Sequence, residues 1–216
     1  MTHSPNTDNI GAEVASKLLD IKAIKLNLDK PFTWASGWNS PIYCDNRLAL
    51  SYADIRTTIK NALADVIKSA YDNVEAIAGV ATAGIPQGAL VADALNIPFV
   101  YVRSKAKGHG MENMIEGKVT PGQKVVVIED LVSTGGSSLK AVADLRNAGF
   151  EVLGMAAIFT YGFDLAYQNF KEAGVTLHCL SNYNILLKEA LERGVIKEDQ
   201  LATLESWRKD PASWGK

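Results

Sequence analysis

The sequence predicts an α/β fold with a doubly wound parallel sheet. Short runs rich in Val, Ile and Ala alternate along the chain with stretches whose apolar residues recur at helical spacing. The runs are apolar throughout rather than at alternate residues, which is typical of strands buried on both faces of a parallel sheet. A chain of 216 residues with 47% hydrophobic residues is long enough for one domain with a sizeable core.

The composition favours a soluble protein of the cytoplasm. The formal net charge of −2 gives no general attraction to nucleic acid or to an anionic membrane. Cys44 and Cys179 are too few for a disulfide framework. The first residues lack the basic and apolar regions of a secretory signal, and no apolar run has the roughly 18 residues that span a bilayer. We therefore expect neither a membrane partner nor a nucleic-acid partner.

Two helices are predicted before the alternating region begins. Residues 9–20 form the first, with apolar residues on one side: Ile10, Val14, Leu18 and Leu19. Residues 31–47 are polar and aromatic, with several turn-forming residues. Ser51 is the predicted N-cap of the second helix, with Asp54 three residues later. The apolar stripe of that helix comprises Ile55, Ile59, Leu63, Val66 and Ile67.

Strands and helices alternate from residue 74 onward. The predicted strands are residues 74–81, 98–103, 124–130, 151–160 and 175–180. The predicted helices are residues 85–95, residues 136–147 and a third that ends near residue 171. Residues 104–117 are polar and contain three glycines. We expect residues 51–182 to form the α/β core. Residues 1–50, with part of 183–216, are expected to form a small hood over it, within a single domain of residues 1–216.

The most informative segment is residues 125–138, which read Val-Val-Val-Ile-Glu-Asp-Leu-Val-Ser-Thr-Gly-Gly-Ser-Ser. Backbone N–H groups in such a loop and at the following helix start bind anions, and the carboxylates of Glu129 and Asp130 accept hydrogen bonds from sugar hydroxyls. Each feature alone has an ordinary explanation. An acid at a strand end is often solvated or caps the next helix, and Gly135 and Gly136 suit a tight turn. Their combination predicts a sugar-phosphate site beyond the carboxyl ends of the strands.

Three other segments can carry chemistry. Residues 78–86 run from a strand through small residues into a helix, either as a tight turn or as a second phosphate loop. Residues 101–111 hold four potential cations within seven residues and form either a solvated basic loop or a mobile anion-binding one. Residues 32–47 fit an aromatic-rich edge hairpin. The sequence contains neither the Gly-x-x-x-x-Gly-Lys-Ser/Thr loop of nucleoside triphosphatases nor the dinucleotide motif Gly-x-Gly-x-x-Gly.

Residues 125–138 resemble the phosphoribosyl-diphosphate signature of the type I phosphoribosyltransferases. Residues 78–86 match the pyrophosphate loop of that family. Residues 32–47 resemble the base-recognition hood of the orotate phosphoribosyltransferases, with the Ser-Gly-x-x-Ser-Pro-x-Tyr pattern intact, and residues 101–111 resemble their mobile catalytic loop. The resemblance implies the type I phosphoribosyltransferase sheet with a small N-terminal hood.

The resemblance also implies a reaction. The 5-phosphoribosyl group moves from 5-phosphoribosyl 1-diphosphate to orotate, giving orotidine 5′-phosphate and pyrophosphate in pyrimidine (UMP) synthesis. The implied catalytic residues are Arg103, Lys107 and His109, which contact the diphosphate partly across the interface of a homodimer. Glu129 and Asp130 hold the ribose hydroxyls. Mg²⁺ is implied on the diphosphate of the substrate, with no direct protein ligand.

The resemblance further implies which residues contact the substrates. The diphosphate turn is formed by Thr82, Ala83 and Gly84. The clamp on the 5′-phosphate is formed by Leu131, Val132, Ser133, Thr134, Gly135, Gly136 and Ser137. Ser133 also contacts orotate, and Tyr43 stacks on its ring. Arg47 is our own candidate for the orotate carboxylate, since a planar guanidinium matches a carboxylate bidentately. Many relatives carry lysine at the positions of Ala35 and Ala83.

Two other functions are alternatives at this point. A purine phosphoribosyltransferase would use the loop of residues 130–137 equally well, but the hood at residues 36–43 and the basic residues 107–109 argue against it. A nucleotide-sensing regulator would keep the fold without catalysis and would not need the basic loop. Its DNA-binding form would normally need a separate helix-turn-helix segment, which the sequence does not suggest.

Overall fold

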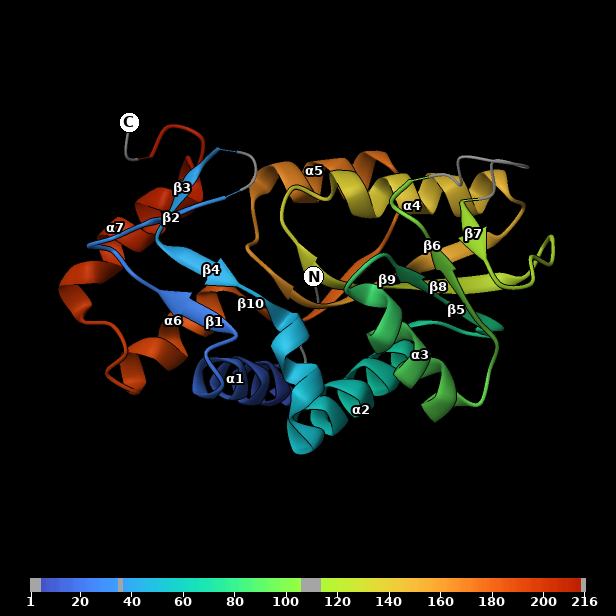
Figure 1. The fold of residues 1–216 in the computed structure, drawn as a ribbon, viewed down its shortest axis with the longest axis horizontal. Coiled ribbons are helices and arrows are strands. Elements are labelled where there is room, and N and C mark those ends of the chain that lie inside the picture. The colour runs from blue at the N-terminus through green and yellow to red at the C-terminus, as the bar shows by residue number, and fades with distance from the viewer. Residues whose placement is uncertain (1–4, 35–36, 106–113, 215–216) are drawn as a thin grey trace.

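The computed structural model describes residues 5–34, 37–105 and 114–214. Its centre is a six-stranded sheet with the order β10-β9-β8-β5-β6-β7 (Figure 1). The strands are β5 (Ala76–Val80), β6 (Phe99–Val102), β7 (Ile115–Glu116), β8 (Lys124–Val132), β9 (Glu151–Thr160) and β10 (Leu177–Asn182). All neighbours are parallel except β6 and β7, which pair antiparallel at one edge. The predicted α/β fold class is confirmed.

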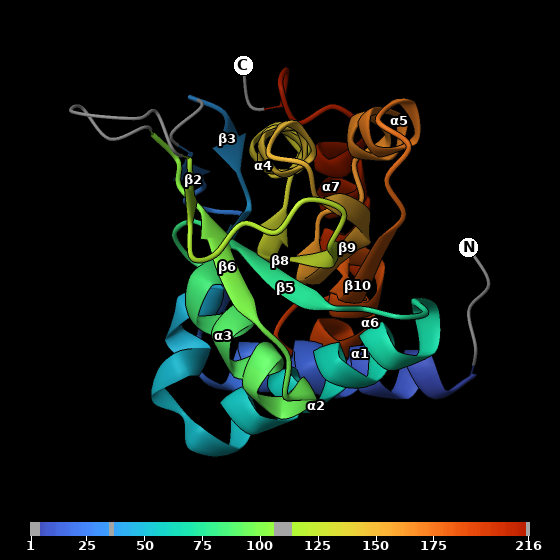
Figure 2. The same ribbon diagram turned by 90° about the vertical axis from the view of Figure 1, so that its right-hand side faces the viewer.

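Helices cover both faces of this sheet (Figure 2). One face carries α1 (Pro5–Asp20), α2 (Ala53–Ala70) and α3 (Gly84–Leu95), and the other carries α4 (Gly136–Asn147) and α5 (Asp164–Glu172). Successive residues of β8 therefore enter different cores. Val126 and Ile128 pack into one apolar cluster, and Val125 and Val127 pack into the other. This two-sided burial explains why the strand is apolar without alternation.

Segments from both ends of the chain lie together beside the sheet (Figure 1). They contain two short antiparallel pairs and two helices: β1 (Ile24–Leu26) with β4 (Ile42–Cys44), β2 (Phe32–Thr33) with β3 (Asn39–Ser40), α6 (Tyr183–Glu192) and α7 (Glu198–Lys209). Trp207 of α7 is fully buried, and its Nε1 donates a hydrogen bond to the Asn39 carbonyl at 3.2 Å. Its ring contacts those of Trp34, Tyr161, Phe163 and Tyr183. We call these five rings the aromatic anchor.

Local structure differs from the sequence prediction in two places. Ser51 is not an N-cap, because residues Asn46–Ser51 form a 3₁₀-helix and α2 begins only after an extended Tyr52, without a side-chain cap. The prediction was therefore wrong at this position. Strand β7 was not predicted from the polar segment that contains it. It forms because Ile115 and Glu116 pair with Val102 and Tyr101 of β6.

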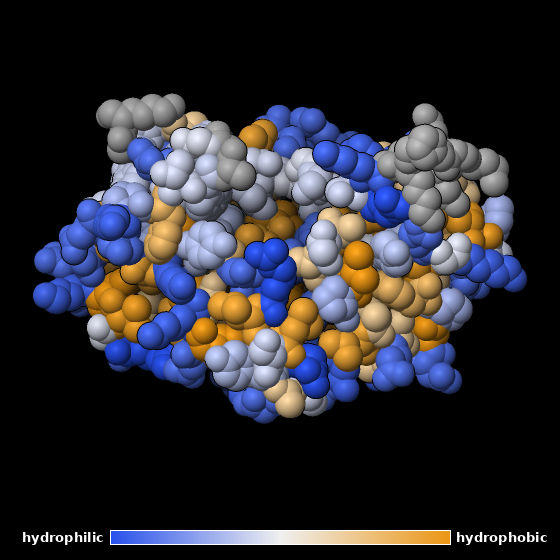
Figure 3. Space-filling model, viewed as in Figure 1, coloured by the Kyte–Doolittle hydropathy of each residue, from blue (hydrophilic) through white to orange (hydrophobic). Residues whose placement is uncertain are grey.

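Apolar residues reach the surface of the face in Figure 3 in several patches separated by hydrophilic residues. The exposed large side chains include Tyr43 and Leu48, at 40% exposure each. Single exposed groups of this kind are ordinary on a folded protein. Within the described ranges, none of the helices has the length and apolar character needed to cross a membrane.

Candidate active site

Glu129 and Asp130 lie inside a paired strand rather than beyond its end. Strand β8 continues past them, and Leu131 and Val132 still pair with Phe159 and Thr160 of β9. The Thr160 hydroxyl also donates a hydrogen bond to the Val132 carbonyl at 3.0 Å. The two acids are therefore mounted on a rigid part of the sheet, which holds their positions before any ligand arrives.

The Glu129 carboxylate is buried, with only 6% of the residue exposed. Its Oε2 accepts a hydrogen bond from Ser138 Oγ at 3.0 Å, and its Oε1 accepts one from the Asp130 N–H at 3.1 Å. Burial, followed by the charge of Asp130, raises the pKa of Glu129 well above its ordinary value. Burial also raises the pKa of Asp130. Glu129 is thus neither a solvated acid nor a cap of the next helix, the two ordinary explanations for its position.

The acid pair forms part of a hollow of about 380 Å³, which we call the acidic hollow. Its walls come from the end of β4 and the residues after it, the turn after β5, and the β8–α4 segment. The lining residues are Cys44, Asp45, Arg47, Ala81, Thr82, Ala83, Glu129, Asp130, Leu131 and Ser137. The hollow brings together the acids, the predicted diphosphate turn and part of the predicted phosphate loop.

Two helices begin beside this hollow without side-chain caps. Ala83 precedes α3, and Gly135 precedes α4 with φ at +83°, a left-handed value that favours glycine. The first amides of a helix have no intrahelical carbonyl and can bind an anion. Gly84 also lets α3 approach β8, because a Cβ there would lie 2.5 Å from the Ile128 carbonyl oxygen. The small residues therefore place two uncapped helix starts at neighbouring strand ends.

A second hollow, of about 240 Å³, is mainly aromatic, and we call it the aromatic hollow. It is lined by Thr33, Trp34, Tyr43, Cys44, Leu131, Ser133 and Tyr161. The centroids of Trp34 and Tyr161 lie 4.9 Å apart, and Trp34 Nε1 donates a hydrogen bond to the Ile42 carbonyl at 3.1 Å. Cys44 and Leu131 line both hollows, so the two sites adjoin.

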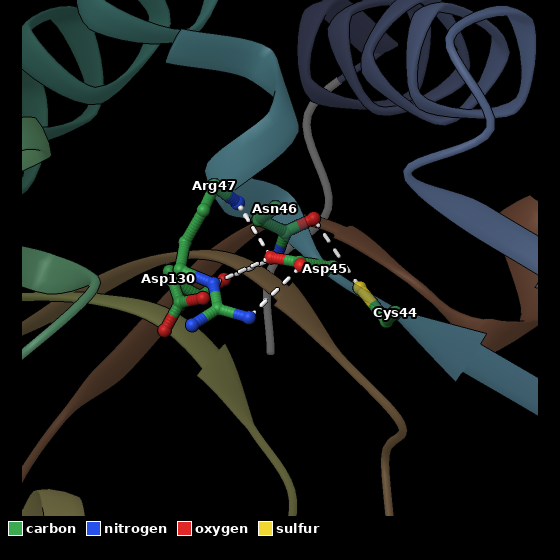
Figure 4. A network of polar contacts seen from close by, with 5 residues as sticks. All are labelled: Cys44, Asp45, Asn46, Arg47 and Asp130. Atoms are coloured by element: carbon green, nitrogen blue, oxygen red, sulfur yellow. Dashed lines mark hydrogen bonds and ion pairs between the residues drawn. The ribbon is translucent and has the colours of Figure 1, made fainter.

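A polar network connects the residues after β4 to the acid pair (Figure 4). Arg47 donates two hydrogen bonds to Asp45, from Nε to Oδ1 at 2.6 Å and from Nη2 to Oδ2 at 2.9 Å. These bonds lower the pKa of Asp45. Asn46 Nδ2 donates to the Asp130 carbonyl at 2.7 Å and accepts the Cys44 thiol on its Oδ1 at 3.3 Å. The network anchors the segment after β4 to β8.

The structure brings most of the predicted substrate-binding residues to these two hollows. Thr82, Ala83, Glu129, Asp130, Leu131 and Ser137 line the acidic hollow, and Tyr43, Leu131 and Ser133 line the aromatic one. Gly84, Gly135 and Gly136 lie at the two helix starts. The Val132 side chain packs in the core instead, and the Thr134 carbonyl accepts a hydrogen bond from Asn169 Nδ2 at 2.9 Å.

Two predicted site residues, Arg47 and Arg103, are placed differently, and two others are not described. Arg47 lines the acidic hollow and not the aromatic one, where we expected it to meet a carboxylate. Arg103 Nη1 pairs with Glu116 Oε1 at 3.2 Å, and in the described part of the chain it lines neither hollow. Lys107 and His109 lie outside the described residues, as does Ala35.

Sequence reasoning missed two walls of the aromatic hollow, Trp34 and Tyr161. Trp34 lies in a segment that was singled out, but it precedes the Ser-Gly-x-x-Ser-Pro-x-Tyr pattern that distinguished Tyr43. Tyr161 directly follows β9. The rule that ligands lie beyond the carboxyl ends of parallel strands could have identified it.

Comparisons with known proteins agree with this geometry. Residues 50–178 match the family model of the phosphoribosyl transferase domain. The chain is 61% identical over 208 residues to the orotate phosphoribosyltransferase of Cytophaga hutchinsonii, covering 96% of this chain and 100% of that protein. It is 59% identical over 206 residues to the orotate phosphoribosyltransferase of Bacteroides fragilis, covering 95% and 97%. The solved orotate phosphoribosyltransferase from Aeropyrum pernix superimposes with a TM-score of 0.73 at 29% identity, covering 85% of this chain and 99% of that one.

Proposed function

The chain belongs to the orotate phosphoribosyltransferase family, and we propose that its two adjoining hollows hold the two substrates of one glycosyl transfer. The reaction moves the 5-phosphoribosyl group from 5-phosphoribosyl 1-diphosphate to orotate, giving orotidine 5′-phosphate and pyrophosphate. It is a step of pyrimidine (UMP) synthesis. Cys44 and Leu131 line both hollows, and this observation carries the assignment of one substrate to each hollow. The reacting ribose and base must meet at a common boundary.

The acidic hollow holds the phosphoribosyl donor. The carboxylates of Glu129 and Asp130 accept hydrogen bonds from the ribose hydroxyls. The 5′-phosphate lies against the amides of residues 131–137 at the start of α4, and the diphosphate lies against the turn of residues 82–84 at the start of α3. Support for this placement comes from the two uncapped helix starts beside the acid pair.

Catalysis follows from where charge develops. Breaking the bond between ribose C1 and the diphosphate oxygen leaves positive charge on the sugar ring and adds negative charge to the leaving group. Glu129 and Asp130 lie on the side of the sugar. Burial raises the pKa of both carboxyl groups, and a positive charge that develops beside them favours their ionised form again. Their fixed positions on β8 mean that little rearrangement is needed at the moment of reaction.

The aromatic hollow holds orotate. A flat pyrimidine ring fits between aromatic faces, and Tyr43, Trp34 and Tyr161 provide them. Ser133 supplies a hydroxyl in the same hollow. This position lets the orotate nitrogen approach the ribose carbon across the boundary formed by Cys44 and Leu131.

Mg²⁺ is held by the diphosphate of the substrate, with no direct protein ligand. This ion prefers oxygen ligands and keeps several waters, which suits diphosphate oxygens in a hollow lined by carboxylates. Within the described residues no cluster of three or more His, Cys, Asp or Glu could hold a metal. When bound with the diphosphate, Mg²⁺ neutralises part of the negative charge on the leaving group.

The basic loop of residues 101–111 acts on the diphosphate. Arg103, Lys107 and His109 close over the diphosphate and exclude water, which would otherwise compete with orotate for the ribose carbon. The loop acts partly across the interface of a homodimer, as the resemblance to the family suggests. The enzyme works in the cytoplasm on small-molecule substrates, without a nucleic-acid or membrane partner, and forms one domain with a hood from residues 1–50 and part of 183–216.

The test is an assay of the purified protein with both substrates and Mg²⁺, following the loss of orotate and the appearance of orotidine 5′-phosphate. We expect product with orotate, none with adenine in its place, and little after Mg²⁺ is chelated. Product with adenine alone would point to a purine phosphoribosyltransferase. A folded protein that binds the donor but forms no product would point to a regulator.

A further inference from the structure

Arg47 is the only cationic side chain that lines the acidic hollow in the described part of the chain. The same hollow contains three carboxylates, those of Asp45, Glu129 and Asp130. A substrate with a diphosphate adds further negative charge to this space. The turn of residues 81–83, which also lines it, has no charged side chain. The position of the Arg47 guanidinium therefore has a large influence on whether a diphosphate is attracted or repelled.

Asp45 fixes the orientation of this guanidinium. The Arg47 side chain is 59% exposed, so without a partner it would sample many rotamers. Its Nε and Nη2 both bind the Asp45 carboxylate, which leaves Nη1 as the nitrogen that does not contact Asp45. Figure 4 shows the guanidinium lying between Asp45 and Asp130. The positive end of the Asp45–Arg47 pair is thus directed at the side of the hollow where the acid pair lies.

We propose that Arg47, oriented by Asp45, binds the diphosphate of 5-phosphoribosyl 1-diphosphate in the acidic hollow. This inference rests on the proposed function, and it replaces the expectation that Arg47 binds the orotate carboxylate. Two observations separate these roles. Arg47 does not line the aromatic hollow, and Asp45 already occupies the Nε–Nη2 edge of the guanidinium, one of the two edges that can match a carboxylate bidentately. A diphosphate oxygen can be bound by Nη1 of Arg47 alone, together with the positive charge of the guanidinium.

The test compares three variants: Arg47→Ala, Asp45→Asn and Lys25→Ala. Lys25 is the matched control, because it is exposed and acts on Asp45 electrostatically but does not line the hollow. The probes are inorganic pyrophosphate with Mg²⁺ and ribose 5-phosphate, titrated by calorimetry, together with the KM for orotate. We expect Arg47→Ala to weaken pyrophosphate binding about tenfold or more, as loss of a charged hydrogen bond does. Ribose 5-phosphate binding and the orotate KM stay unchanged.

Two further results support the role of orientation and charge. Asp45→Asn weakens pyrophosphate binding less than Arg47→Ala does, since the cation remains but is no longer fixed, and one negative charge of the hollow is removed. Adding Ala83→Lys to Arg47→Ala restores part of the affinity, because it returns a cation to the same hollow. Lys25→Ala has no effect on either probe.

Three outcomes would overturn the inference. A raised orotate KM with unchanged pyrophosphate binding would place Arg47 at the base. Equal weakening of pyrophosphate and ribose 5-phosphate would mean that Arg47 acts through the acid pair and not on the diphosphate. If Arg47→Ala changed neither pyrophosphate binding nor the orotate KM, Arg47 would have no part in substrate binding. Failure of the proposed function is a separate result, because it appears in the wild-type assay as absence of orotidine 5′-phosphate.

Discussion

Replacing Trp207 with alanine tests whether the aromatic anchor maintains the aromatic hollow. Trp207 is fully buried, and its ring centroid lies 5.6 Å from that of Trp34 and 5.7 Å from that of Tyr161. Truncating a buried tryptophan to alanine typically costs about 3–5 kcal/mol of unfolding free energy. For a protein of this size, each kcal/mol lowers Tm by roughly 2–4 °C, so the expected decrease is roughly 6–20 °C.

The same change should weaken orotate binding while leaving the phosphoribosyl side intact. Trp34 and Tyr161 line the aromatic hollow, and both lose a packing partner, whereas none of the four rings that contact Trp207 lines the acidic hollow. We therefore expect a higher KM for orotate and an unchanged affinity for inorganic pyrophosphate. Trp207→Phe keeps an aromatic ring and loses the hydrogen bond to Asn39, so its effect should be smaller, at about 0.5–1.5 kcal/mol.

The assays are urea unfolding followed by circular dichroism, and steady-state kinetics at a temperature where the variants are folded. Trp214→Phe is the matched control, because Trp214 also packs against the core but is only partly buried and lines neither hollow. A folded Trp207→Ala protein with an unchanged orotate KM would refute the reasoning. So would parallel losses for orotate and pyrophosphate, since they would indicate a general loosening.

Two other predictions follow from the site. Lys107→Ala should lower kcat by about 10²–10³ and change the orotate KM little, because one lost transition-state contact costs about 2.7–4 kcal/mol. Lys105→Ala is its control in steady-state kinetics, and an unchanged kcat for Lys107→Ala would exclude the role. Glu129→Gln should raise the unfolding free energy at pH 7. The folded-state pKa of Glu129 is raised, so ionisation destabilises the fold as pH rises from about 4.3 through that higher value. Denaturant titrations across pH should show that the gain in unfolding free energy of Glu129→Gln over the unmodified protein disappears below about pH 4. A gain that instead grew in acid would contradict the direction of the pKa shift.

The central sheet could be predicted because its signals are local. Val125 to Ile128 form one apolar run, and burial on both faces of a parallel strand is the simplest reason for such a run. The acid pair was equally visible, since it follows that run directly. The carboxyl ends of neighbouring parallel strands lie at the same edge of a sheet. This rule alone predicts which other segments lie beside the acid pair.

The aromatic hollow could not be predicted in the same way. Trp34, Tyr161 and Trp207 are far apart in the sequence, and their contacts depend on how the ends of the chain fold beside the sheet. The C-terminal tryptophan carried no chemical signal of its own. Arg47 was recognised as a candidate anion-binding group by its type. The hollow that it would line depended on Asp45, two residues away, and on the 3₁₀-helix that turns the chain there.

The placement of the two hollows along the chain also affects the order in which they are completed during translation. Every residue that lines the acidic hollow precedes residue 138, whereas the aromatic hollow needs Tyr161, which rests against Trp207 near the end of the chain. The lining residues of the acidic hollow therefore leave the ribosome before Tyr161 of the aromatic hollow and before Trp207, which packs against Tyr161. A chain that stops between Tyr161 and Trp207 carries every lining residue of both hollows but lacks the ring that holds one of them together.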